Sequence, residues 1–291
     1  MLSWLLYLNG ITYMIDFISL NAVAYSSFLV GLASLVISLE TLVSKRLFVQ
    51  GEILDWRTTR LSVSHWAFAL FNGIFNFPWM FGFLTTAKAL LSMLVIYQAI
   101  NQSISINTLC LLFMIHQLSN YRMPIGRDGS MQMTSVMIFG LMLIAWPHHP
   151  YLHRLGLFFI SAQIVIAYTA SGWAKWCSPI WRHENVLAQI FNTKSFGRPR
   201  IASLLKQHVK LSRTASIAVM TWQASFPLVL FSSSKLLSIY LLIGFSFHLS
   251  IAIIMGLNTF LYSFTACYPI LIIGINELHR VAPWLQVINW K

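Results

Sequence analysis

Residues 20–43 read LNAVAYSSFLVGLASLVISLETLV, and this stretch decides the class of fold. It contains a single charged side chain, Glu40, close to its end. A run of about 20 apolar residues has the length of a helix that crosses a bilayer. A transmembrane β-barrel would alternate apolar and polar residues, and this block does not. The stretch therefore predicts a membrane-spanning α-helix.

Composition extends this prediction to all 291 residues, of which 57% are hydrophobic and only 9% charged. Soluble domains have about 25% charged residues. We therefore predict an all-α integral membrane protein, with residues 1–291 forming a single domain. Its polytopic bundle is predicted to have about eight transmembrane helices, at residues 20–43, 79–99, 104–119, 131–146, 155–176, 214–232, 236–255 and 257–275. The segments 1–20 and 61–77 are predicted to lie in the membrane interface.

The net charge of +12 comes from 19 basic and 7 acidic residues. Loops after odd-numbered spans hold thirteen basic residues, whereas loops after even-numbered spans hold two. The positive-inside rule places the odd loops in the cytoplasm and the N-terminus outside, although Arg280 and Lys291 oppose this orientation. Because no basic run belongs to a soluble domain, the charge predicts contact with the lipid bilayer and not with nucleic acid.

Cysteine and histidine residues do not predict a disulfide framework or a metal site. The three cysteines are isolated in apolar sequence, which predicts buried helix positions. Three histidines lie near two prolines without an acidic partner, which favours a surface loop over a metal site. These residues are Cys110, Cys177 and Cys267, and His148, His149 and His153.

Lys175 lies near the end of the fifth predicted span. A lysine at helix-centre depth costs about 2.5–3.5 kcal/mol. One interpretation is that its long side chain reaches the headgroups. The other is a site between helices, because Tyr168, Ser171 and Lys175 share one helix face by spacing and Gly172 permits another helix to approach. A lysine in such a site can act as a base.

Two further places contain candidate residues. His248 lies within the seventh predicted span with no charged residue within twelve positions. It can hydrogen-bond a neighbouring helix or take part in proton transfer or ligand contact. Asn120 ends the third span, and Asp128 or Ser130 is predicted to cap the fourth helix. No nucleotide-binding motif accompanies the glycines around Asp128.

Four stretches together resemble the HTTM family, the membrane domain shared with vitamin K-dependent γ-glutamyl carboxylase. They follow one another in the family's order and span most of the chain. They are Gly51–Arg57 (GEILDWR), Asn120–Ser130 (NYRMPIGRDGS), Tyr168–Arg182 (YTASGWAKWCSPIWR) and Phe245–Leu257 (FSFHLSIAIIMGL).

The resemblance implies roles for individual residues. Lys175 matches the lysine that deprotonates vitamin K hydroquinone, and His248 matches the histidine of a Phe-His pair, so both are expected to be catalytic. The expected cofactor is a hydroquinone such as reduced vitamin K, with Tyr168, Ser171, Asn120 and Asp128 as cofactor-binding residues. Where the carboxylase has a further catalytic histidine after an asparagine, this chain has Tyr121 after Asn120.

The resemblance thus implies a carboxylase- or epoxidase-like membrane enzyme. The carboxylase's large soluble C-terminal domain has no counterpart up to Lys291, so we do not expect glutamate carboxylation to carry over unchanged. Small bacterial relatives are associated with maturation of secreted peptide toxins, which implies a secreted peptide substrate and a bacterial plasma membrane.

Two other functions stay open. One is a non-catalytic membrane factor for maturation or export of a secreted peptide toxin. A transporter is less favoured, because the spans contain few acids and no paired broken helices. The resemblance and the charge rule also disagree on one point. The carboxylase works from the lumenal face, whereas the loop charges place Lys175 nearer the cytoplasm.

Overall fold

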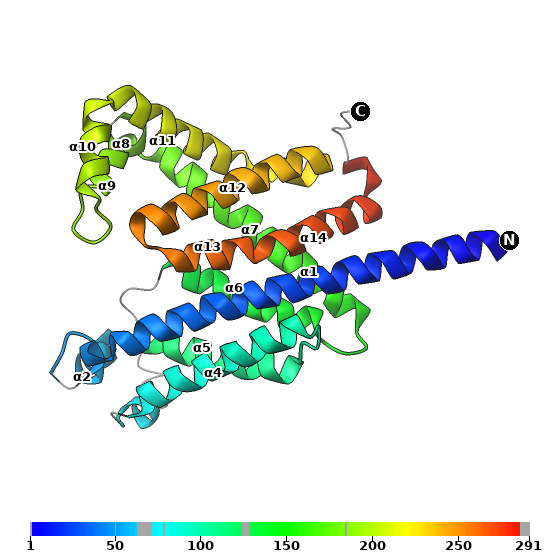
Figure 1. The fold of residues 1–291 in the computed structure, drawn as a ribbon, viewed down its shortest axis with the longest axis horizontal. Coiled ribbons are helices and arrows are strands. Elements are labelled where there is room, and N and C mark those ends of the chain that lie inside the picture. The colour runs from blue at the N-terminus through cyan, green and yellow to red at the C-terminus, as the bar shows by residue number, and fades with distance from the viewer. Residues whose placement is uncertain are drawn as a thin grey trace. The chain divides into compact units, whose positions relative to one another are not determined.

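The computed structural model describes residues 2–49, 51–62, 71–77, 79–123, 128–183 and 185–285, with side chains from residue 20 onward except 62 and 183. Every regular element in these ranges is a helix, and Figure 1 labels the α-helices along the chain. Residues 63–70 of the segment 61–77, which is predicted to lie in the interface, fall outside the described residues.

Five helices are long and apolar enough to cross a membrane. They coincide with the first, second, fifth, seventh and eighth predicted spans, so the prediction of an all-α integral membrane protein is confirmed. Their bounds are Leu20–Val43 within α1 (Leu2–Val43), Met80–Ile100 (α4), Pro150–Cys177 (α7), Ser234–Met255 (α12) and Asn258–Val281, which comprises α13 (Asn258–Thr265) and α14 (Cys267–Val281).

The other three predicted spans are helical but shorter. They are α5 (Ile106–Arg122), α6 (Gly129–Ile144) and α11 (Val209–Ala224), of 17, 16 and 16 residues. A bilayer core of about 30 Å needs about 20 helical residues. The count of about eight transmembrane helices therefore stays a prediction.

Two prolines explain where the predicted spans are interrupted. The predicted span 214–232 changes after Ala224 into the 3-10 helix η3 (Phe226–Phe231), which contains Pro227. Proline lacks a backbone N–H and restricts the residue before it, so the α-helix ends there. Pro269 lies just after the break between α13 and α14 at Ala266, and its ring would crowd the carbonyl four residues earlier in a continuous helix.

The chain divides into two compact units. The first unit comprises Met1–Leu157 and Tyr262–Ile270, and the second comprises Phe158–Leu261 and Leu271–Lys291. The single domain expected from the sequence stays a prediction.

In the first unit, α1 packs along α4, α4 along α5 and α5 along α6 (Figure 1). The helices meet through small and hydroxyl-bearing residues, as helices in lipid do. A methyl group on Gly31 would lie 2.7 Å from Ile96 of α4. The Ser92 hydroxyl donates to Ser34 at 2.8 Å.

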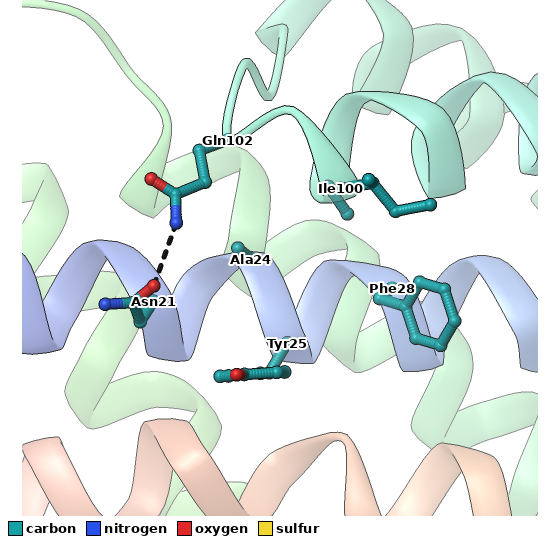
Figure 2. A pocket seen from close by; sticks show the side chains of 7 residues that line it. Asn21, Ala24, Tyr25, Phe28, Ile100 and Gln102 are labelled. Carbon is teal, nitrogen blue, oxygen red and sulfur yellow. Dashed lines mark hydrogen bonds between the residues drawn. The ribbon is translucent and has the colours of Figure 1, made fainter.

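The end of α4 is tied to α1 where the chain turns toward α5. Figure 2 shows the Gln102 amide reaching Asn21, with a hydrogen bond of 2.8 Å. The adjoining pocket, of about 310 Å³, is also lined by Tyr25, Phe28 and Ile100. The loop after α4 therefore lies beside the start of the first span. This is required if successive spans cross the membrane in opposite directions.

At the other end of the first unit, short helices follow α1. These are η1 (Lys45–Phe48), α2 (Trp56–Thr59) and η2 (Arg60–Ser62). Arg122, at the end of α5, donates a hydrogen bond of 2.7 Å to the carbonyl of Leu54 in this loop. The loops after the first and third predicted spans thus lie on one side, which agrees with their shared positive charge.

In the second unit, three short helices separate α7 from α11. These are α8 (Pro179–His183), α9 (Val186–Ile190) and α10 (Pro199–Gln207). Arg198 donates to the carbonyl of Ile254 near the end of α12 at 2.7 Å, which brings the loops after the fifth and seventh predicted spans together. Gly256 ends α12 with a φ of 75°, a left-handed conformation that glycine adopts freely. The 3-10 helix η4 (Pro283–Leu285) follows α14.

The cysteine prediction was wrong at one of its three positions. Cys267 is buried and Cys110 is part-buried, but Cys177 is exposed. The reason is that Cys177 is the last residue of α7, where the helix ends.

Candidate functional site

Lys175 is part-buried near the end of α7, and its ammonium group is held by neutral oxygens. The Nζ atom donates to Oε1 of Gln223 on α11 at 2.9 Å, to the carbonyl of Ser171 at 3.1 Å, and to the Ser171 hydroxyl. It also lies 5.3 Å from the centre of the Trp181 ring. No carboxylate pairs with it in the described part of the chain. The side chain is thus turned toward α11, which favours the interhelical site over a reach to the headgroups.

The face predicted for α7 is the face that meets α11. Tyr168 packs against the Trp222 ring at 4.9 Å between centroids, and Ser171 donates to Gln223 at 3.4 Å. Gly172 lies between these contacts, and a methyl group there would overlap the backbone of Gln223 and Ala224. The missing side chain therefore permits the close approach by which Lys175 reaches Gln223.

His248 on α12 hydrogen-bonds Tyr168 on α7. The Tyr168 hydroxyl and His248 Nε2 lie 2.9 Å apart, and each residue is only 2% exposed. Rings of Trp222 and Phe226 surround Tyr168. This is the interhelical hydrogen bond that the sequence offered as one interpretation of His248. Helix α11 connects Lys175 with His248. Lys175 donates to Gln223 on α11, and Tyr168, which hydrogen-bonds His248, packs on the neighbouring Trp222.

The indole N–H of Trp222 is a buried donor without a hydrogen-bond acceptor among the described residues. The large majority of buried polar groups in proteins have a partner. Because Trp222 packs against Tyr168, this donor lies beside the Tyr168–His248 pair. The second unit therefore contains an unused donor among its candidate residues.

Asn120 and Asp128 belong to the first unit, whereas Lys175 and His248 belong to the second. Asp128 caps α6, as predicted, because one carboxylate oxygen accepts from the backbone N–H groups of Ser130 and Met131 at 3.0 and 3.1 Å. The Asn120 amide donates to Ser135 at 3.3 Å. Residues 124–127 of this stretch, including Gly126 and Arg127, lie outside the described residues.

Arg122 was predicted only as one of the basic loop residues that set the orientation, but it lies buried at the end of α5 as the centre of a second cluster. It is 2% exposed, and its guanidinium carbon lies 5.2–5.5 Å from the ring centres of Phe48, Trp56 and Phe81. Two of its N–H groups donate to Leu54 O and to the Thr59 hydroxyl. Residues from the first and second HTTM-like stretches thus meet here.

Lys88 was not among the predicted site residues, yet it is 1% exposed near the middle of α4. Its ammonium group forms no ion pair with a carboxylate of the described residues. It is close enough to the fully buried His116 of α5 to interact with it electrostatically. The signal was present, because a lysine within an apolar stretch was the feature that singled out Lys175.

No group of three potential metal ligands occurs in the described ranges. Comparison of the chain with models of protein families, with curated proteins and with solved structures finds no match in any of the three.

Proposed function

We propose that the protein is an integral-membrane enzyme of the HTTM type, in which Lys175 accepts a proton from a hydroquinone-like cofactor. The observation that carries the proposal is the inward Lys175, held by Ser171 and Gln223 and by no carboxylate in the described chain. Loss of its proton would break no ion pair, so a base function is accessible.

A small aromatic group with oxygen substituents would bind beside Tyr168 by displacing part of the ring packing there, because Tyr168, Trp222 and Phe226 are buried against one another. The Trp222 N–H, which has no acceptor among the described residues, could then donate to an oxygen of that group. A bound hydroquinone would supply the acidic hydroxyl group and the reducing electrons. His248 would orient the Tyr168 hydroxyl through their hydrogen bond.

The proton step follows from the contacts of Lys175. In its amine form Lys175 would take the proton, so that an O–H bond breaks and an N–H bond forms. The oxygens of Ser171 and Gln223 would then hold the resulting ammonium group where it is. We further propose that the enzyme modifies a secreted peptide in a bacterial plasma membrane.

Replacement of Lys175 by Arg tests the base role, because arginine keeps the charge but does not lose its proton in proteins. We expect Lys175→Arg and Lys175→Ala each to lower turnover about a hundredfold or more, the range of general-base catalysis. The assay is consumption of added vitamin K hydroquinone by purified protein in lipid nanodiscs, with protein level measured in parallel. Lys206→Arg on the exposed face of α10 is the matched control.

A second variant separates the base from a merely structural lysine. Glutamate has nearly the same shape as glutamine, so Gln223→Glu would place a carboxylate where the amide oxygen lies, 2.9 Å from Nζ of Lys175. This carboxylate would form an ion pair with the ammonium group, and Lys175 would therefore hold its proton more tightly. We expect turnover to fall while the folded protein is at least as stable. Full turnover in Lys175→Arg at normal protein level would contradict the base role of Lys175. Absence of turnover in the wild type would contradict the enzymatic function and leave a non-catalytic factor for a secreted peptide as the better account.

A further inference from the structure

A pocket of about 140 Å³ lies in the first unit, beside the end of α5. Arg122, Arg57, Asp55 and Asn76 supply its polar lining, and the rings of Trp56 and of four phenylalanines supply the rest. None of these residues takes part in the function proposed for the second unit.

The Arg122 guanidinium is a permanent positive charge that is almost wholly buried. No carboxylate lies within ion-pair distance of it in the described ranges. The rings of Phe48, Trp56 and Phe81 attract a cation but do not neutralise it. Because a buried charge without an oppositely charged partner is costly, an anion beside Arg122 would be strongly favoured.

Asp55 is near enough to interact electrostatically with Arg122 but forms no ion pair with it, and its oxygens accept hydrogen bonds within the loop. Oδ2 accepts the Gly51 N–H at 3.0 Å, and Oδ1 accepts the Arg57 N–H at 3.2 Å. The pKa of Asp55 is lowered by the hydrogen bond from Gly51, with smaller contributions from Arg57 and Arg122. Asp55 therefore stays ionised, and the lining of the pocket contains two arginines and this one carboxylate.

We propose that this pocket binds a phosphate group, with Arg122 and Arg57 as its cationic ligands. The planar fork of arginine matches phosphate oxygens and gives short, charge-assisted hydrogen bonds. One water needs about 10–15 Å³ of such cavity space, so 140 Å³ leaves room for a tetrahedral phosphate. The phosphate can belong to a lipid headgroup, which the basic loops of membrane proteins contact, or to the free anion.

The test uses the full chain, purified in dodecyl maltoside without phosphate. The thermal unfolding midpoint is followed in two titrations, one with inorganic phosphate against chloride at equal ionic strength, and one with phosphatidylglycerol against diacylglycerol in mixed micelles. The variants are Arg57→Gln, Arg122→Lys, which keeps the charge and removes the fork, and Arg46→Gln. Arg46 is an exposed arginine of the same loop that does not line the pocket.

We expect the midpoint of the wild type and of Arg46→Gln to rise with the probe. Arg57→Gln and Arg122→Lys should need at least about ten times more probe than the wild type for the same rise, which is the loss expected for one charge-assisted hydrogen bond. A rise with phosphatidylglycerol alone assigns the phosphate to a lipid, and a rise with inorganic phosphate shows that the free anion is accepted. No rise with either probe, or equal rises in Arg57→Gln and the wild type, overturns the proposal. Arg57→Gln decides the test if Arg122→Lys does not fold.

Discussion

Lys88 in the first unit and Lys175 in the second are two lysines within long apolar helices, and their surroundings differ. Lys175 is part-buried close to a helix end, with its ammonium group held by Ser171 and Gln223. Lys88 is 1% exposed, with about 12 Å of helix between it and the start of α4, and its ammonium group has no partner in the described chain.

In these two lysines, the depth of the ammonium group in its helix does not go together with the number of acceptors around it. A charge costs more the deeper it lies in a membrane, yet the deeper lysine is the one without acceptors. Lys175 has the assembled acceptors of a site, whereas Lys88 is a cost to folding that the described contacts do not offset. Sequences usually accept such a cost where function requires it. Three predictions test the difference between buried charges that have partners and those that do not.

The largest effect is expected at Gly172, on which the acceptors of Lys175 depend. Gly172→Ala would overlap backbone atoms of α11, which cannot rotate away as a side chain can. We expect a loss of about 3 kcal/mol in the free energy of unfolding, the upper part of the range for overpacking. The measurement is denaturant unfolding in detergent. The control is Gly82→Ala in α4, where a methyl group meets nothing within 4 Å. Equal effects at the two glycines would show that α7 and α11 are not closely packed.

The second effect is a change in stability that is expected to have opposite signs when Lys88 and Lys175 are replaced by methionine. Lys88→Met removes a buried charge and keeps an unbranched side chain, so we expect stability to rise by about 2 kcal/mol, as when buried ionic groups are replaced by apolar ones. Lys175→Met should instead lower stability, because it removes the donor for Gln223 and Ser171. Unfolding of the two variants in the same detergent provides the measurement. A loss of stability in Lys88→Met would mean that the ammonium group has a stabilising partner.

The smallest effect concerns Asp55, a charge that is compensated by backbone groups. Asp55→Asn should cost about 1 kcal/mol at neutral pH, because the amide oxygen can still accept from the Arg57 N–H but no second oxygen is left to accept from the Gly51 N–H. The folded pKa of Asp55 is lowered, chiefly by Gly51, so its contribution is present above the unfolded pKa of about 3.9 and is lost as the pH falls through the lower folded value. The difference between variant and wild type should therefore shrink between pH 5 and 3. A difference that is constant over this range would rule out the ionised carboxylate as its source.

Local patterns predicted what depends on neighbours in sequence. Apolar runs predicted the five long helices, and spacing placed Ser171 and Lys175 on one face, four residues apart. The cap at Asp128 followed from its position before an apolar run. Pro227 stands in the sequence as a signal for the end of α11, which a window of mean hydropathy does not register.

Contacts between distant residues could not be predicted in this way. Gln223 lies 48 positions beyond Lys175, and His248 lies 80 beyond Tyr168. Which helices pack together depends on close approaches such as that of Gly172, and the sequence only permits these. Arg122 could not be recognised as a cluster centre from the sequence, because the aromatic rings around it come from three other segments of the chain.

Because Cys177 is exposed, labelling its thiol can show on which side of the membrane the Lys175 site lies. Cys177 follows Lys175 by two residues at the end of α7, whereas Cys267 is buried and Cys110 part-buried. A charged maleimide does not cross a bilayer, so its reaction with this native thiol in intact or opened cells reports on which side α7 ends. The conflict between the loop charges and the lumenal site of the carboxylase then becomes a labelling measurement on an unmodified chain.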